Sequence, residues 1–258
     1  MRFDILVRTC ARVEAFTGRP RFIAVPKQEL LLRCLHSLIL SINACLQAYR
    51  AFEISLTVLD DHSDPQTVRR VRSLLGTAQV PTRFLTLAGT GNGQSLLENY
   101  EYARNHCPDL IYFCEDDYLH DRIAITEMLQ TYDLLQPSFP NGLALHPCDY
   151  PDRYLAPYPS YIYLGSTRFW RTILHTTGTF AITNAVLRRY YEHYLAFTRY
   201  GIDPTISEDN SINRVYREVP CISPLPSLAI HLQYVHTLSP FVDWQAWWEA
   251  AQVPEPVQ

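Results

Sequence analysis

One stretch decides the fold: Leu110-Ile111-Tyr112-Phe113-Cys114-Glu115-Asp116-Asp117-Tyr118, in which five apolar or aromatic residues run directly into three carboxylates. A short, uninterrupted apolar run of this length predicts a buried strand in a sheet that is covered on both faces. Adjacent acids at its carboxyl end raise one another's pKa and destabilise the fold unless positive charge neutralises them. A divalent cation held by oxygen ligands is the usual solution. A solvated turn that happens to gather three acids is the alternative.

Strands and helices alternate on both sides of this stretch. The apolar spacing predicts strands at 3–7, 53–59, 82–87 and 110–114, and helices at about 28–49, 65–76, 94–106 and 122–135. This β-α-β-α order predicts an α/β fold with a mostly parallel central sheet flanked by helices. Prolines crowd residues 137–160, which predicts a loop over a site. The aromatic residues between Tyr150 and Trp170 share this stretch and suggest a lid. Short strands around 161–164 and 177–183 and helices at about 185–197 and from Ser207 complete the expected order.

Composition narrows the classes of function. A chain of 258 residues with 47% hydrophobic residues can bury the core of one large domain. The net charge of -4 gives no basic field for nucleic acid. Seven scattered cysteines form no CxxC pair, and the sequence has no signal peptide and no apolar run of transmembrane length. We therefore expect a cytoplasmic protein without a transmembrane segment. Lys27 is the single lysine among 22 basic residues.

Polar residues follow three of the predicted strands and should meet at one edge of the sheet. Thr9 ends the first strand, Asp60-Asp61 end the second and Glu115-Asp116-Asp117 end the fourth. Parallel strands deliver their carboxyl ends to the same side, where open α/β sheets bind ligands. An aspartate after the second strand can accept hydrogen bonds from a base or a ribose, and an acid after the fourth can ligate a metal on a diphosphate. Arg104, on the helix before the fourth strand, is expected to face the same crevice.

Five short motifs, in order, resemble those of GT-A glycosyltransferases and especially of glycosyltransferase family 2. The run from Asp60 to Thr67 is similar to the family's DDxSxDxT signature. Gly91-Asn92-Gly93 with Ala103-Arg104-Asn105 is similar to its glycine loop and ArN helix, and Glu115-Asp116-Asp117 stands at the place of its DXD motif. Residues 177–180, leading to Leu187-Arg188-Arg189, resemble its acceptor segment, and Glu208-Asp209 with Asn213-Arg214 resemble its ED…R motif. Glu115 in place of the leading aspartate, and Cys10-Ala11-Arg12 in place of Tyr-Asn, depart from the pattern.

The resemblance implies a single GT-A domain, residues 1–258, with a donor half at about 1–120 and an acceptor half with a C-terminal tail at about 140–258. It implies a metal-dependent, inverting transfer of a sugar from a nucleotide-diphosphate donor to a glycan, lipid-linked or small-molecule acceptor. Mn²⁺ or Mg²⁺ is the implied cofactor, with Asp117 as its ligand and Glu115 and His231 as further candidates. Donor contacts would come from Thr9, Arg12, Asp60, Asp61, Ser63, Arg104 and Asp116. Asp209, with Glu208 beside it, would act as the base.

Two alternatives remain open. The first is a catalytically inert nucleotide-sugar-binding protein on the same fold. The second is a sugar-phosphate nucleotidyltransferase, which shares this sheet order but needs a phosphate loop rich in glycine and arginine directly after the first strand. Residues 8–21 contain a single glycine, Gly18, which disfavours the second alternative.

Overall fold

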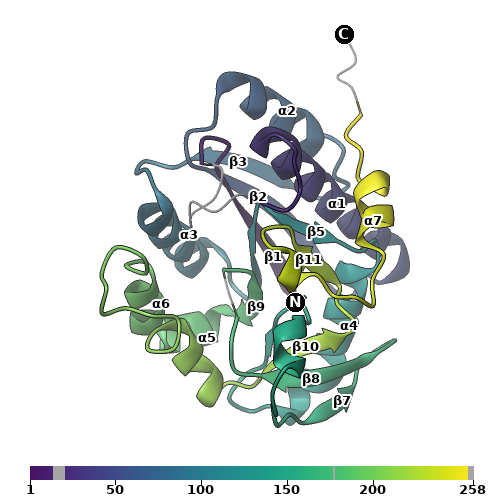
Figure 1. The fold of residues 1–258 in the computed structure, drawn as a ribbon, viewed down its shortest axis with the longest axis vertical. Coiled ribbons are helices and arrows are strands. Elements are labelled where there is room, and N and C mark those ends of the chain that lie inside the picture. The colour runs from purple at the N-terminus through teal and green to yellow at the C-terminus, as the bar shows by residue number, and fades with distance from the viewer. Residues whose placement is uncertain (14–20, 177, 255–258) are drawn as a thin grey trace.

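The computed structural model describes residues 1–13, 21–176 and 178–254, and a nine-stranded sheet runs through that part of the chain (Figure 1). Gly18 and Thr177 lie outside the described residues. The strand order is β3-β2-β1-β4-β9-β6-β10-β8-β7. The first four strands in this order are parallel to one another: β3 (Thr82–Thr86), β2 (Glu53–Asp60), β1 (Arg2–Thr9) and β4 (Leu110–Glu115). The predicted α/β fold, with a central sheet flanked by helices, is confirmed.

The second half of the sheet is mixed. It comprises β9 (Phe180–Thr183), β6 (Ala144–Leu145), β10 (Cys221–Leu225), β8 (Phe169–Ile173) and β7 (Ile162–Leu164). β9 runs antiparallel to β4, so the two halves of the chain share one continuous sheet. A separate two-stranded ladder pairs β5 (Tyr118–His120) with β11 (Ala229–His231) in antiparallel register. This ladder continues directly from the acids that end β4.

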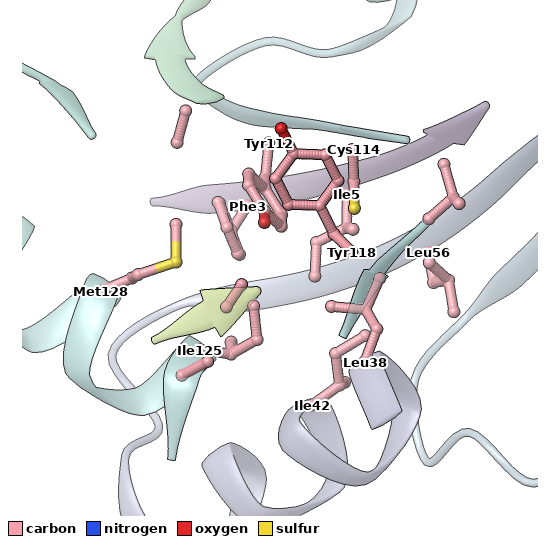
Figure 2. Packing of buried hydrophobic residues seen from close by; sticks show 14 of the residues in the cluster. Phe3, Ile5, Leu38, Ile42, Leu56, Tyr112, Cys114, Tyr118, Ile125 and Met128 are labelled. Atoms are coloured by element: carbon pink, nitrogen blue, oxygen red, sulfur yellow. The ribbon is translucent and has the colours of Figure 1, made fainter. Parts of the chain in front are cut away.

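The two faces of the sheet build two cores because side chains alternate along each strand. On one face Phe3 and Ile5 of β1 pack with residues of α1 (Lys27–Ala48), α2 (Pro65–Leu75) and α4 (Ala124–Leu135). Figure 2 shows Leu38 and Ile42 of α1 and Met128 of α4 directed at this cluster. On the other face Leu6 joins a second cluster with α3 (Asn92–His106), α5 (Asn184–Arg189) and α6 (Tyr191–Phe197). The even-numbered residues of β1, Arg8 among them, therefore face α3.

Helix α1 is long and apolar enough to pass a test for membrane-spanning helices by length and composition alone. In the structure 67% of that apolar window is buried against the sheet and its neighbours. Helix α7 (Trp244–Ala250) covers part of it, and Trp248 is buried there beneath the guanidinium of Arg33. The packing of α1 is that of a core helix.

Three expectations for the second half are wrong. Residues 143–150 are buried, and β6 lies between β9 and β10, so this part of the proline-rich segment is core rather than a loop. Its apolar Leu143-Ala144-Leu145 outweighs the flanking prolines. The helix expected at about 185–197 ends at Arg189 and restarts at Tyr191 as α6. Ser207 starts a turn instead of a helix: its hydroxyl accepts a hydrogen bond from the Asn210 amide (3.2 Å), and only a 3₁₀ helix, Ile212–Arg217, follows.

The remaining short elements are 3₁₀ turns, at Gln136–Ser138, Pro151–Tyr154 and Val235–Thr237.

Candidate active site

A cleft of about 410 Å³ lies at the carboxyl ends of β1, β2 and β4. From the first half it is lined by strand-end and helix-start residues, among them Thr9, Cys10, Asp61, Asn92, Glu115, Asp116 and Asp117. From the second half it is lined by Gly178, Phe197, Tyr200, Glu208, His231 and Gln233. The expected convergence of strand ends is therefore present, and residues of the second half of the chain complete the lining of the cleft. Neither the expected loop at 137–160 nor the aromatic residues between Tyr150 and Trp170, expected to form a lid, are among the lining residues.

Each of the three consecutive acids is paired with a different basic side chain. Arg8 donates to Glu115 (2.6 Å), Lys27 donates to Asp116, and Arg21 donates to Asp117 (2.8 Å). Burial lowers the pKa of Lys27, but the carboxylates of Asp116 and Asp117 outweigh it and raise that pKa above its usual value. The positive charge that the acid cluster requires thus comes from the chain itself.

Asp117 also faces His231, across the ladder of β5 and β11. Nε2 of His231 lies 3.4 Å from Oδ1 of Asp117, a buried oxygen that has no hydrogen-bond partner among the described residues. The register pairs His231 with Tyr118, and their rings stack at 4.6 Å, which fixes the imidazole next to the acid. Burial opposes both charges, yet His231 holds the pKa of Asp117 well below its usual value, and Asp117 raises the pKa of His231.

These two side chains fit a divalent cation. A carboxylate oxygen without a partner is a ligand that Mn²⁺ and Mg²⁺ prefer, and a neutral imidazole nitrogen is a further ligand for a transition metal such as Mn²⁺. No cluster of three or more His, Cys, Asp or Glu ligands is found among the described residues. The cation would therefore complete its coordination with oxygens of a bound molecule. Glu115, the other acid considered for this role, is occupied by Arg8, and a Cβ at Gly178 would lie 2.5 Å from its carboxyl carbon.

Asp60 and Asp61 have different surroundings and different roles. Asp60 is buried and accepts hydrogen bonds from the hydroxyls of Thr9 (2.8 Å) and Ser63 (2.6 Å), so it braces the ends of β1 and β2 against each other. Asp61 lines the cleft and accepts a hydrogen bond from the amide of Gly91 (2.8 Å) at the start of α3. Gly91 has a φ of +89°, which favours glycine. Of the two, Asp61 is the one placed to meet a ligand.

Glu208 and Asp209 also separate. Glu208 lines the cleft, and burial, followed by the nearby charges of Glu115 and Asp209, raises its pKa to about 7. The side chain of Asp209 is 70% exposed, lies outside the cleft lining, and accepts from Asn213 (3.1 Å) beside His175. The turn that replaces the expected helix is the reason: it directs the glutamate inward and the aspartate outward.

Four predicted donor contacts are not among the residues that line the cleft: Arg12, Asp60, Ser63 and Arg104. Arg12 is exposed and is not among the lining residues. Arg104 lies near the carboxyl end of α3, while the amino end of that helix borders the cleft, and its guanidinium stacks on Tyr191 at 4.4 Å. Both arginines belong to the surface in this structure.

Sequence reasoning missed the basic side chains of the cleft. Arg8, the residue before the last of β1, donates to Asn92 (2.8 Å) and Ser95 (2.7 Å) at the start of α3 as well as to Glu115. Its position next to Thr9 was the available signal. For Lys27 the available signal was that it is the single lysine in a chain whose other basic residues are arginines. In the structure this lysine is buried in the lining of the cleft.

Comparison with known proteins identifies the fold. No protein-family model and no curated protein matches the chain. Among solved structures, TarS 1–349 of S. aureus in complex with UDP matches with a TM-score of 0.51 and 14% identity over 100% of this chain and 67% of that one. Its complex with UDP-GlcNAc gives 0.51 and 13% over 96% and 64%. The mannosyltransferase PcManGT of Pyrobaculum calidifontis, in complex with GDP-Man and Mn²⁺, gives 0.50 and 15% over 95% and 59%.

These likenesses are of fold, and the chain has the GT-A fold of these transferases. In a further structure of TarS 1–349, the present chain spans 60% of the length of the TarS chain.

Proposed function

We propose that this chain is a glycosyltransferase that moves a sugar from a nucleotide-diphosphate donor to an acceptor hydroxyl, with inversion at the anomeric carbon. One observation carries the proposal: a single cleft brings the acids at the ends of β2 and β4 together with Glu208 and His231 of the second half. Proteins of the same fold have been solved with UDP, UDP-GlcNAc and GDP-Man bound. The acceptor we expect is a glycan, a lipid-linked sugar or a small molecule.

We assign the donor to the first half of the chain. Asp61, at the end of β2 beside Gly91, is placed to accept hydrogen bonds from a base or ribose, and Thr9 lies next to it. Asp116 already accepts hydrogen bonds from the amide of Cys10 (2.8 Å) and from Lys27, which fix its carboxylate in the lining of the cleft. We infer that Asp116 contacts the ribose or the sugar.

Asp117 and His231 would hold Mn²⁺ or Mg²⁺. Oδ1 of Asp117, which is buried and has no hydrogen-bond partner among the described residues, supports this assignment. Bound there, the cation would offset the negative charge of the departing nucleoside diphosphate. Glu115, tied to Arg8, would keep that end of the cleft rigid without contacting the cation.

Glu208 is our candidate for the base, in place of Asp209. It would take the proton of the acceptor hydroxyl as the acceptor oxygen attacks the anomeric carbon and the bond to the diphosphate breaks. A carboxylate whose pKa is about 7 suits this task, because a general base works best when its pKa is near the operating pH.

Donor binding and turnover test the proposal together. In a thermal-shift and calorimetric panel of nucleotide sugars with Mn²⁺, the donor should stabilise the fold by mass action, and a matching acceptor should release the nucleoside diphosphate. Asp117→Ala should remove Mn²⁺-dependent turnover while the protein stays folded. Unchanged turnover in that variant would refute the assignment. Binding without turnover on any acceptor would favour the inert nucleotide-sugar-binding protein.

We also propose the cytoplasm as the compartment. All seven cysteines are free thiols in the structure, and six of them are buried. A reducing compartment suits this pattern.

A further inference from the structure

The carboxylate of Asp117 in the cleft lies between two basic side chains, Arg21 and His231. Oδ2 of Asp117 accepts a hydrogen bond from Nη1 of Arg21 at 2.8 Å, while Oδ1 faces His231 at 3.4 Å without a hydrogen bond. Both partners of the ion pair are nearly buried, with side-chain exposures of 8% for Arg21 and 11% for Asp117. Arg21 also lines the cleft, so its guanidinium borders the space that a ligand would fill.

A divalent cation at Asp117 would lie within a few ångströms of this guanidinium. Like charges at such a separation repel strongly in a partly buried site, where the effective dielectric constant is well below that of water. Arg21 and the cation therefore compete for the same carboxylate. Lys27 adds to the repulsion, because its ammonium is bound to the neighbouring Asp116.

A nucleoside diphosphate would change this balance. Its phosphate oxygens offer the planar guanidinium a bidentate partner with more negative charge than one carboxylate. Once Arg21 bonds to phosphate, Asp117 loses its counter-ion and becomes available to the cation, which the same phosphates also ligate.

We propose that Arg21 is an internal counter-ion of the cation site: it occupies Asp117 in the ligand-free cleft and transfers to the diphosphate when the donor binds. Arg21 thereby makes tight cation binding conditional on the nucleotide. This inference rests on the proposed function, since it requires a diphosphate ligand and a cation at Asp117 and His231.

The test is Mn²⁺ affinity, measured by calorimetry and by the loss of the free Mn²⁺ signal in electron paramagnetic resonance. Without nucleotide, Arg21→Gln should bind Mn²⁺ about tenfold or more tightly than the wild type, because the competitor has been removed. Addition of UDP or GDP should then raise the Mn²⁺ affinity by a larger factor in the wild type than in Arg21→Gln. Equal or weaker binding of Mn²⁺ alone by Arg21→Gln would overturn the inference.

Matched variants identify the site of any gain. Arg50→Gln removes one positive charge from an exposed arginine whose Nε bonds only to the carbonyl of Leu46 in its own segment, and should leave Mn²⁺ affinity unchanged. The double variant Arg21→Gln with Asp117→Asn should lose the gain; if the gain persists, the tight site is elsewhere and the inference fails. Arg21→Met also removes the charge and should give a similar gain. It serves as the test if Arg21→Gln does not fold, and no gain in it would again refute the inference.

The outcome also separates this inference from the proposed function. Wild-type protein that binds nucleotide with Mn²⁺, while Arg21→Gln leaves the affinity for Mn²⁺ alone unchanged, refutes the role of Arg21 and leaves the glycosyltransferase proposal standing. Wild-type protein that binds no nucleotide sugar, UDP or GDP under any condition refutes both.

Discussion

At the scale of single residues, two adjacent acids have opposite surroundings, and the difference assigns the base. Glu208 lines the cleft and Asp209 is exposed outside it. We expect Glu208→Gln to lower the rate of transfer by about 10²–10⁴, the range typical of general-base catalysis. Asp209→Asn, the matched control one residue away, should cost less than tenfold. Single-turnover rates with saturating donor measure both. A larger loss in Asp209→Asn would restore the aspartate as the base.

The same residue predicts a pH dependence. Burial and the charge of Glu115 raise the pKa of Glu208 to about 7, and only its deprotonated form can accept a proton. The wild-type rate should therefore fall as the pH drops below 7 and level off above it. The profile of Glu208→Gln should lack this limb, and a limb that survives in the variant would show that another group titrates.

Lys27 supplies a prediction on stability. Its ammonium is 5% exposed and bound to Asp116, so Lys27→Met would leave a buried carboxylate without its cation. We expect a loss of about 3–5 kcal/mol in the free energy of unfolding, measured by urea denaturation. Arg199→Met, which breaks an exposed ion pair with Asp203, should cost about 1 kcal/mol or less. Similar losses in the two variants would contradict the structural role of Lys27.

At the scale of elements, the parallel half could be predicted because each strand and helix there has its own periodic signal. β4 begins with a continuous apolar run, and β1 and β2 are rich in Ile, Leu and Val. Asp64 before Pro65 caps α2 through the amides of Gln66 and Thr67. In the mixed half, β6 has only two residues, which is too short for any period to register. It is set by pairing with β9 and β10, which are distant in sequence. β7 was expected at about 161–164, and it pairs with β8, the next strand along the chain.

The candidate site divides in the same way. The acids could be predicted because each follows a strand directly, and parallel strands end at one edge. Their cations could not: Arg21 and Lys27 reach Asp117 and Asp116 across 96 and 89 residues, and such pairs are made only by the folded chain. The sequence pattern favoured a helix from Ser207, whereas the structure has a turn there. For this reason the sequence could not predict that Glu208, and not Asp209, lines the cleft.

Helix α3 begins with a close approach that only glycine permits. A Cβ at Gly93 would lie 2.4 Å from the carbonyl oxygen of Thr198, just beyond α6. Gly93→Ala should therefore destabilise the fold by about 1–3 kcal/mol, although alanine is the better helix former by about 1 kcal/mol. Glu101→Ala, at an exposed position of the same helix, should change stability by less than about 0.5 kcal/mol in urea denaturation. A stabilised Gly93→Ala would mean that α3 and α6 separate more easily than this packing implies.

At the scale of the whole molecule, the cleft joins the two halves of the chain in two ways. β4 and β9 pair in the sheet, and the ladder of β5 and β11 brings His231 to Asp117 from 114 residues away, since 231 − 117 = 114. The halves therefore share a core, and the proposed donor and acceptor sides are parts of one structural unit. Charge in the cleft should accordingly affect global unfolding.

The pair of His231 and Asp117 predicts how stability varies with pH. Because Asp117 raises the pKa of His231, the stabilisation from the charged imidazole is complete below the unfolded-state value of about 6.5 and is lost as the pH rises through the higher folded-state value. Because the pKa of Asp117 is lowered, its share is present above about 3.8 and is lost only in acid. The pair is therefore worth most between about pH 4 and 6.5.

His231→Gln should thus lower the free energy of unfolding by about 1–3 kcal/mol at pH 5.5, and by less at pH 9, where a smaller fraction of the wild-type imidazole carries its proton. Urea denaturation at the two pH values, without divalent cations, measures the difference. His106→Gln, at an exposed position near the end of α3, should change stability by less than about 0.5 kcal/mol at either pH. A destabilisation by His231→Gln that is the same at both pH values would mean that the ring acts through its stacking on Tyr118 and not through its charge, because stacking does not depend on the proton.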